Sequence, residues 1–257
     1  IPLTKASSPA RDEPGPGPHP SIADAGWSLV WCQVKVLLFH LARPVLLPVL
    51  RLLVGLRVEG LEHVPAKGPV LMVANHLHNA DPVLLMAAFP RPIRFMAKKE
   101  LFEVPVIGWI VRQAGAFPVD RSSPVREVRT LHRAERLLAR GMIVGIFPEG
   151  MRSVTGGLQE AHPGVAMLAL HSGAPILPTA IFGTEVLPFN GRKGRRRGTG
   201  RPRVTVRIGV PFHLQPIAAP HRHEGFAELT DEIMMKIAWL LPPRYRGIYA
   251  ERVEATH

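Results

Sequence analysis

The sequence predicts an α/β fold with a mostly parallel central sheet flanked by helices. Short apolar runs bounded by Gly or Pro, the length of buried strands, alternate along the chain with longer segments of helical periodicity. Hydrophobic residues make up 46% of the 257 residues, enough for the core of one large domain. We therefore expect strands that are covered on both faces by the helices connecting them.

The individual elements follow from these runs and from the residues that begin or end them. Apolar or alternating segments predict strands over residues 57–60, 70–74, 93–97, 116–119, 142–147, 175–182 and 204–209. Helical periodicity predicts helices over residues 81–89, 106–113, 124–140, 164–171 and 224–241. The longest of the middle helices has an apolar stripe of Val125, Val128, Leu131, Ala134 and Leu138, which we expect to face the core.

Two segments precede the α/β domain, which we assign to residues 57–245. Residues 1–25 are rich in Pro, Gly and Ser and predict a disordered tail. Residues 26–56 are apolar but contain charged residues and prolines, so no uninterrupted run is long enough for a simple spanning helix. They predict a membrane-associated two-helix segment on the bilayer surface, with two core helices of a soluble domain as the alternative. Residues 246–257 are expected to form a C-terminal tail.

The chain is strongly basic, with a net charge of +12 and a pI near 10.9. Much of this charge lies in a Gly-rich loop over residues 190–203. Such a balance indicates an anionic partner: nucleic acid, an anionic membrane lipid or a phosphorylated substrate. Basic and aromatic residues do not alternate densely, so stacking on single-stranded nucleic acid is not expected. The single cysteine, Cys32, excludes an intrachain disulfide and a cysteine metal cluster.

One loop brings a histidine and an aspartate together. His76 follows the predicted strand 70–74, and Asp81 precedes Pro82 at the start of the next helix, where it is expected to act as the N-cap. A short loop of this kind lets the carboxylate fold back onto the imidazole and fix its tautomer. The alternative is that Asp81 only caps the helix and His76 is an ordinary loop histidine.

Polar side chains also follow three other predicted strands. Because active groups gather at the carboxyl ends of the strands in open α/β sheets, these side chains are expected to share one edge of the sheet. The four strand ends carry His76 and Asp81, Lys98 and Lys99, Asp120 and Arg121, and Glu149 and Arg152. The cations among them are suited to binding a phosphate group.

Four ordered motifs give the chain a family resemblance. They are Asn75-His76-x4-Asp81, Gly115-Ala-Phe117-Pro-Val-Asp120-Arg121, Phe147-Pro-Glu149-Gly150-Met151-Arg152-Ser153 and Ile176-Leu-Pro178-Thr-Ala180. The chain from Val58 to Gly183 resembles the 1-acylglycerol-3-phosphate acyltransferases and their glycerolipid acyltransferase relatives. Two positions depart from that family's pattern: Met151 stands where threonine is usual, and His78 where serine is common.

The resemblance implies an acyl transfer without a covalent enzyme intermediate. His76 would act as general base, with Asp81 as its partner. The acyl donor would be acyl-CoA or acyl-carrier protein, the acceptor would be lysophosphatidic acid, and no metal or further cofactor would take part. Other lysophospholipids or a glycolipid stay open as acceptors. The resemblance also implies a location at the cytoplasmic face of a membrane.

The same resemblance implies the residues that bind the substrate. Arg121 and Arg152 would hold the phosphate with help from Lys98 or Lys99. Glu149 would contact the glycerol hydroxyl or hold its own loop. The remaining motif positions expected in the substrate site are Asn75, Gly150 and Ser153.

Two other classes of function remain as alternatives. His76-x-His78 is a possible metal pair of a metallo-hydrolase, although no further histidine lies in a matching block. The positive charge alone also fits a non-enzymatic protein that binds anionic membranes or nucleic acid.

Overall fold

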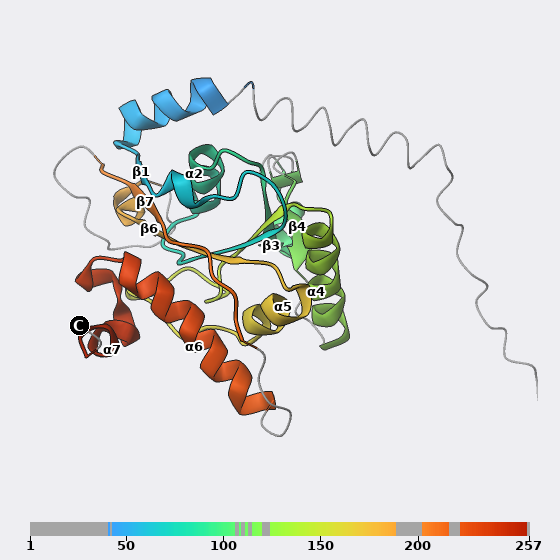
Figure 1. Cartoon of the computed structure of the whole chain (residues 1–257). Helices are drawn as coiled ribbons and strands as arrows, with labels where there is room; N and C mark the ends of the chain where they lie inside the picture. Colours follow the sequence, from blue (N-terminus) through green and yellow to red (C-terminus); the bar gives the residue numbers. More distant parts are fainter. Residues whose placement is uncertain are drawn as a thin grey trace, which may run out of the picture. The chain divides into compact units, whose positions relative to one another are not determined.

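A single seven-stranded sheet forms the centre of the molecule (Figure 1). The computed structural model describes residues 41, 43–105, 108, 111–112, 115–119, 124–188, 202–215 and 222–255. The strands are β1 Arg57–Glu59, β2 Val70–Ala74, β3 Ile93–Lys98, β4 Phe117–Val119, β5 Ile143–Ile146, β6 Ile176–Phe182 and β7 Thr205–Ile208. Their spatial order is β1-β7-β6-β2-β5-β3-β4, which places β2 near the middle.

Most neighbouring strands are parallel, as the sequence predicts. β2 pairs in parallel with β5 on one side and with β6 on the other, and β3 continues the parallel arrangement to β4. β7 is antiparallel to β6 and parallel to β1, so these two strands run opposite to the rest. The carboxyl ends of β2 and β5 therefore lie side by side at one edge of the sheet.

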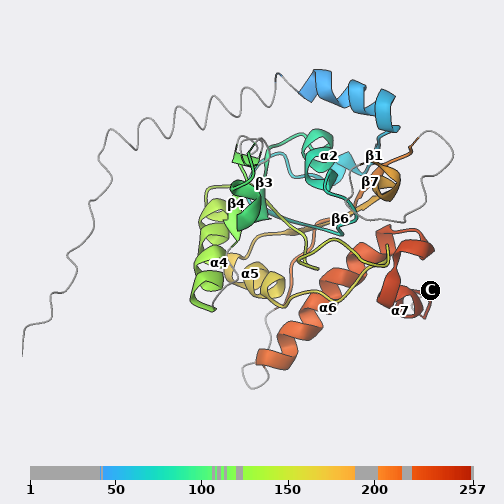
Figure 2. The same ribbon diagram turned by 180° about the vertical axis from the view of Figure 1, so that it is seen from behind.

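Helices cover both faces of the sheet (Figures 1 and 2). Besides a helix over residues 43–54, the helices include α2 Asp81–Ala88, α4 Pro124–Ala139, α5 Gly164–Ser172, α6 Arg222–Leu240 and α7 Ala250–Glu254. β2 is buried along its whole length because Leu71 and Val73 join the core with α4, α5 and α6, whereas Met72 joins a second core with α2. This explains why the strand is a continuous apolar run rather than an alternating one.

Short 3₁₀ helices connect these elements. They are η1 Leu61–His63, η2 Lys99–Phe102, η3 Thr184–Val186, η5 Pro243–Tyr245 and η6 Gly247–Tyr249. The segment expected as a C-terminal tail from residue 246 is instead packed against the domain through η6 and α7. Tyr249 and Val253 are buried in the same core as α6. The domain thus continues to residue 255.

The core-facing side of α4 differs in part from the predicted stripe. Ala134 and Leu138 are buried as expected, but Val128 is 47% exposed. Thr130 is buried in its place, with its exposed fraction at 6%. The buried face therefore follows the 130–134–138 row, and apolar character alone misplaced one position.

The segment before β1 is helical where it is described. Residues 43–54 form a helix, while residues 1–40, including the predicted tail and the start of the two-helix segment, lie outside the described residues. Leu47, Leu50 and Val54 pack against the α2 side of the core. The opposite side exposes Val45, Leu52 and Leu53 by 67%, 66% and 63%.

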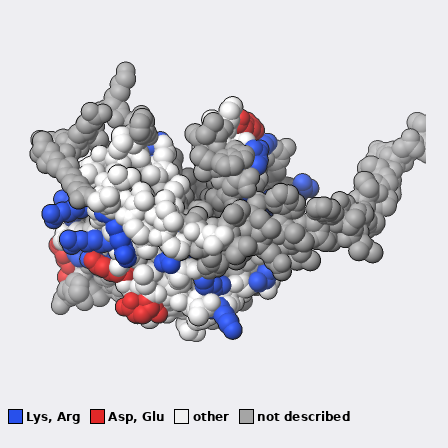
Figure 3. Space-filling view, turned by 90° about the horizontal axis from the view of Figure 1, so that it is seen from above, with Lys and Arg blue, Asp and Glu red and all other residues white. Residues whose placement is uncertain are grey.

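Seen from above, the surface has a broad uncharged area, with Lys and Arg as well as some Asp and Glu side chains at its margins (Figure 3). No described helix is both long and apolar enough to cross a membrane.

Candidate active site

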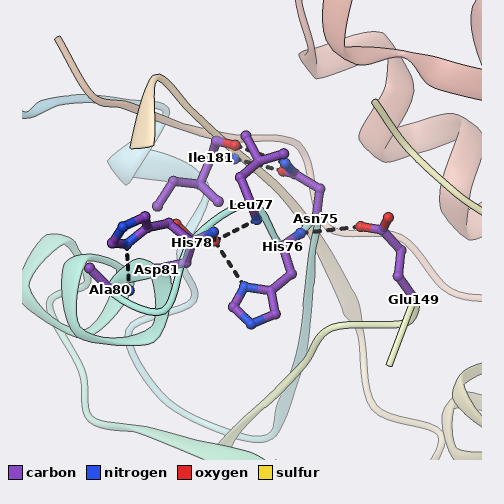
Figure 4. A network of polar contacts seen from close by, with 8 residues as sticks. All are labelled: Asn75, His76, Leu77, His78, Ala80, Asp81, Glu149 and Ile181. Carbon is purple, nitrogen blue, oxygen red and sulfur yellow. Dashed lines mark hydrogen bonds and ion pairs between the residues drawn. The ribbon is translucent and has the colours of Figure 1, made fainter. Parts of the chain in front are cut away.

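The imidazole of His76 is held by the carboxylate of Asp81 in the loop that follows β2 (Figure 4). Nδ1 of His76 lies 2.8 Å from Oδ2 of Asp81, and the two side chains are 16% and 0% exposed. A carboxylate accepts hydrogen bonds, so Nδ1 carries the proton and Nε2 has its lone pair available. Nε2 points away from the network in Figure 4, the orientation a general base needs to reach a substrate.

Asp81 stabilises the loop as well as the imidazole. Its Oδ2 also accepts the backbone N–H groups of Leu77 and His78, each at 2.7 Å. The structure corrects the expectation that Asp81 caps the helix. Asp81 is the first helical residue, Ala80 occupies the cap position, and no side chain caps the helix. The carboxylate turns back to the loop, where it fixes the path between strand and helix.

Glu149 lies directly behind the histidine, in the turn that follows β5. Its Oε1 accepts the backbone N–H of His76 at 3.2 Å, and its Oε2 accepts that of Gln159 at 3.1 Å. The carboxyl group is buried, and this burial raises its pKa to about 7 against the lowering effect of the two backbone N–H groups. Of the two roles expected for Glu149, this geometry supports that of holding the loop.

Two further contacts from the same turn fix His76. The backbone N–H of Ser153 donates to the carbonyl of His76 at 2.7 Å, so both backbone polar groups of His76 are engaged. The ring of Phe147 stacks on the imidazole with 4.2 Å between centroids and 18° between planes. Phe147 in turn stacks on Phe95. The turn closes at Gly150, whose φ of 68° is in the region that favours glycine.

Two residues expected in the substrate site use their side chains on the backbone. The amide of Asn75 donates to the carbonyl of Ile181 and accepts its N–H, both at 2.8 Å, which ties β2 to β6. The hydroxyl of Ser153 donates to the carbonyl of Gly157 and accepts the N–H of Gly156. Both side chains are buried, at 2% and 1% exposed. Substrate contact by either residue stays a prediction.

The predicted phosphate-binding cations lie at different distances from this centre. Arg152 precedes Ser153, whose backbone N–H bonds the carbonyl of His76, so its backbone lies beside the His76 loop. Lys98 ends β3, which is two strands from β2 and hence about 10 Å across the sheet. Its side chain is 75% exposed and pairs with Glu100 at 3.7 Å, and Lys99 follows it in η2. Arg121 lies outside the described residues.

His78 points away from His76 (Figure 4). Backbone groups engage both of its ring nitrogens. Nδ1 faces the N–H of Ala80 at 3.0 Å, and Nε2 faces the carbonyl of Pro188 at 3.1 Å. This orientation does not favour a metal shared by His76 and His78.

Several of these contacts have no signal in the sequence. The backbone link from Gln159 to Glu149 spans ten residues of irregular chain, and the His78–Pro188 bond spans 110. The stacking of Phe147 on His76 depends on the adjacency of β2 and β5. Only the motif containing Phe147 could have indicated it.

Comparison with known proteins assigns the chain to a class, the acyltransferases. A family model described as acyltransferase matches residues 55–182, the part of the chain that carries β1 to β6 and the His76 loop. The chain is 31% identical to the 1-acyl-sn-glycerol-3-phosphate acyltransferase of Bacillus subtilis, over 71% of this chain and 86% of that protein. It is also 31% identical to the enzyme of that name from Pseudomonas aeruginosa, over 73% of each chain.

A solved structure supports the same assignment. The 1-acyl-sn-glycerophosphate acyltransferase of Thermotoga maritima has a TM-score of 0.53 and 26% identity, covering 76% of this chain and 80% of that chain. The chain therefore belongs to the 1-acyl-sn-glycerol-3-phosphate acyltransferase family, as its motifs predict. It spans less than half the length of the chloroplastic relatives from Arabidopsis thaliana and Brassica napus, 44% and 40%.

Proposed function

We propose that the protein transfers an acyl chain from an acyl thioester to the free hydroxyl of lysophosphatidic acid, forming phosphatidic acid. The observation that carries this proposal is the His76–Asp81 pair, with Nδ1 bonded at 2.8 Å to a fully buried carboxylate. Membership of the family, whose matched members are named for 1-acyl-sn-glycerol-3-phosphate, supports the choice of acceptor. The donor is acyl-CoA or acyl-carrier protein.

The reaction needs one base and one leaving thiol. Nε2 of His76 removes the proton from the acceptor hydroxyl as its oxygen attacks the thioester carbonyl. The buried carboxylate of Asp81 stabilises the imidazolium that results. As the C–S bond breaks and the C–O bond remains, the imidazolium returns the proton to the thiolate. Backbone N–H groups near a helix start stabilise the oxyanion between these steps.

The cationic side chains around the His76 loop bind the phosphate of the acceptor. Arg152 is the described candidate beside the His76 loop, with Arg121 as its expected partner and Lys98 or Lys99 assisting. Met151 is 60% exposed and adjoins Arg152, so it is positioned to influence which acceptor is preferred. Another lysophospholipid or a glycolipid is the alternative acceptor.

We place the reaction at the cytoplasmic surface of a membrane. The exposed apolar side of the 43–54 helix supports this, because large exposed apolar patches mark interaction sites. The net positive charge supports an anionic lipid surface.

The test is release of free thiol by the whole chain in mixed micelles with acyl-CoA and a panel of lysophospholipids. We expect turnover with lysophosphatidic acid, its loss in His76→Ala and a strong reduction in Asp81→Ala. His132→Ala is the matched control, since His132 bonds Glu135 through Nδ1 at 2.9 Å on the surface of α4. Folded protein that releases no thiol with any acceptor contradicts the proposal, and full thiol release by His76→Ala would overturn the role of His76 as general base.

A further inference from the structure

The segment Thr184–Pro188 lies between the His76 loop and the C-terminal part of the domain, and both hold it by hydrogen bonds. It begins as η3 directly after β6, the strand beside β2. At its end, the carbonyl of Pro188 accepts a hydrogen bond from His78. At its start, the carboxylate of Glu185 accepts one from Tyr245. The segment thus connects two parts of the chain that are more than 150 residues apart in sequence.

The His78 contact requires a neutral imidazole in one tautomer. Nδ1 accepts the N–H of Ala80, so it must be unprotonated, and Nε2 must carry the proton that it donates to Pro188. Burial lowers the pKa of His78 below its ordinary value, although Asp81 and the backbone carbonyls of Pro188 and Leu187 act in the opposite direction. The side chain is 3% exposed, so the neutral form needs no solvent contact. The side chain of His78 therefore forms a bridge between Ala80 and Pro188, and it is buried and held at both nitrogens rather than mobile at the surface.

The same bridge stabilises the geometry around Asp81. The backbone N–H of His78 donates to Oδ2 of Asp81, and the carbonyl of His78 accepts the N–H of Asp81 at 3.0 Å. The side chain of His78 also holds Ala80, one of the two residues between them. Fixing this turn fixes the carboxylate that orients His76.

Tyr245 anchors the other end of the segment. Its hydroxyl donates to Oε1 of Glu185 at 2.6 Å and accepts from Arg244 at 2.8 Å. The backbone carbonyl of Tyr245 accepts the N–H of Leu158 at 3.0 Å. Leu158 precedes Gln159, which donates to Glu149 behind His76. Two routes therefore lead from Tyr245 to the His76 loop, one through Glu149 and one through His78.

We propose that His78 is a positioning residue of the acyl-transfer site, holding the Asp81 turn against the Thr184–Pro188 segment that Tyr245 anchors. This rests on the proposed function of His76 as general base. His78 does not touch the reacting atoms; it acts by keeping Asp81, and through it the imidazole of His76, in place.

The first test is steady-state kinetics of the whole chain with lysophosphatidic acid and acyl-CoA. We expect His78→Ala to lower kcat roughly 10- to 100-fold with little change in KM, because small misplacements of a reacting group have effects of that size. His78→Gln should recover part of the loss, since its amide can donate to the carbonyl of Pro188. Unchanged kcat in folded His78→Ala would overturn the proposal.

The chain offers a matched control for the far end of the bridge. Tyr249 bonds Asp231 at 3.1 Å, and Arg252 completes that cluster as Arg244 completes the one at Tyr245. We expect Tyr245→Phe to lower kcat several-fold and Tyr249→Phe to leave it unchanged. The effects of Tyr245→Phe and His78→Gln should be non-additive, since both act through one segment. Equal effects of the two tyrosine variants, or strict additivity, would contradict the link through Thr184–Pro188.

An NMR measurement tests the positioning role of His78 separately from the proposed acyl transfer. The proton on Nδ1 of His76 bonds a buried carboxylate, and its NMR resonance is assigned by its loss in His76→Ala. We expect that resonance to shift in His78→Ala and to stay in place in Tyr249→Phe. Loss of folded protein would lower its intensity without moving it. If the wild-type chain releases no thiol, the proposed function fails, and this resonance still decides whether His78 positions His76.

Discussion

Three hydrogen-bond donors converge on a single oxygen of Asp81, so this residue holds the loop after β2 in its conformation. Oδ2 accepts Nδ1 of His76 and two backbone N–H groups, while no described group bonds the buried Oδ1. An asparagine would fill the same space without the negative charge. It would also bury an N–H₂ group at the position where no acceptor is described.

We expect Asp81→Asn to lower kcat by roughly 10²- to 10⁴-fold, the range for general base catalysis, because nothing then stabilises the imidazolium. The measurement is thiol release at saturating acceptor. Glu135→Gln is the control, since Glu135 also bonds a histidine, His132, but on the exposed side of α4. A fall of equal size in both variants would argue against a catalytic role for Asp81.

Glu149 gives the site a dependence of stability on pH. Folding raises the pKa of its carboxyl group from 4.5 to about 7, mainly by burial. The folded state therefore binds the proton more tightly than the unfolded state. This contribution to stability is fully present below about pH 4.5 and is lost as the pH rises through 7.

We expect the free energy of unfolding of the wild-type chain to fall, between pH 5 and 8, by roughly 2 to 3 kcal/mol more than that of Glu149→Gln. Urea denaturation of both proteins at the two pH values measures the difference, in which the other titrating groups cancel. Parallel pH profiles would show that the burial of Glu149 has no such effect.

The residues of the site were predictable to different degrees. The spacing around His76 and Asp81 indicates their contact because it spans only five residues. Asn75 belongs to the same motif, yet its side chain bonds Ile181, 106 residues away, through the register of β2 and β6. His78 stands where serine is common in the family, so the resemblance suggests no role for its imidazole, and its bond to Pro188 depends on where η3 lies.

At the scale of elements, close backbone packing holds the segment that follows Glu149 against η6, in the C-terminal part of the domain. Gly157 and Gly247 approach so closely that a Cβ on Gly157 would lie 2.6 Å from Cα of Gly247. A Cβ on Gly247 would overlap the backbone carbonyl of Leu158, and the φ of Gly247 is 54°. Glycine at position 247 is therefore required for both its conformation and its lack of a side chain.

We expect Gly247→Ala to be more destabilising than Gly68→Ala and to lower kcat, because only the first displaces Leu158 and the chain leading to Glu149. Gly68 has a φ of 83° but open space around it, so its substitution reports backbone strain alone, of order 1 kcal/mol. Thermal unfolding and thiol release measure the two effects. Equal destabilisation with unchanged kcat in both variants would contradict the role given to this contact.

Element positions were more predictable than strand directions. The buried strand β2 and the helix α5 lie within a residue of their predicted bounds, because Gly and Pro delimit their apolar runs. The alternation in β7 indicates a strand but carries no information on its direction, which is opposite to that of β6. The packing of α7 was missed because its five residues are too few to have a visible period.

For the whole molecule, charge and apolar surface together predict how the protein meets a membrane. The chain has 32 Lys and Arg against 20 Asp and Glu, and the helix over residues 43–54 exposes Leu52 by 66%. Coulombic attraction to anionic lipid weakens with salt, since the Debye length falls from about 10 Å at 0.1 M to about 3 Å at 1 M. Burial of an apolar side chain in the bilayer does not depend on salt in this way.

We therefore expect the chain to sediment with anionic vesicles at low salt and to be partly retained at 1 M salt, with Leu52→Asp losing the part that salt does not remove. Val210→Asp is the matched control, because Val210 is equally exposed, at 66%, but follows β7 at the end away from that helix. A residue of leucine size contributes about 2 kcal/mol when buried, so the loss should approach 30-fold in the high-salt partition coefficient. If both variants lose binding alike, general surface hydrophobicity explains the retention; if neither does, the helix over residues 43–54 does not enter the bilayer.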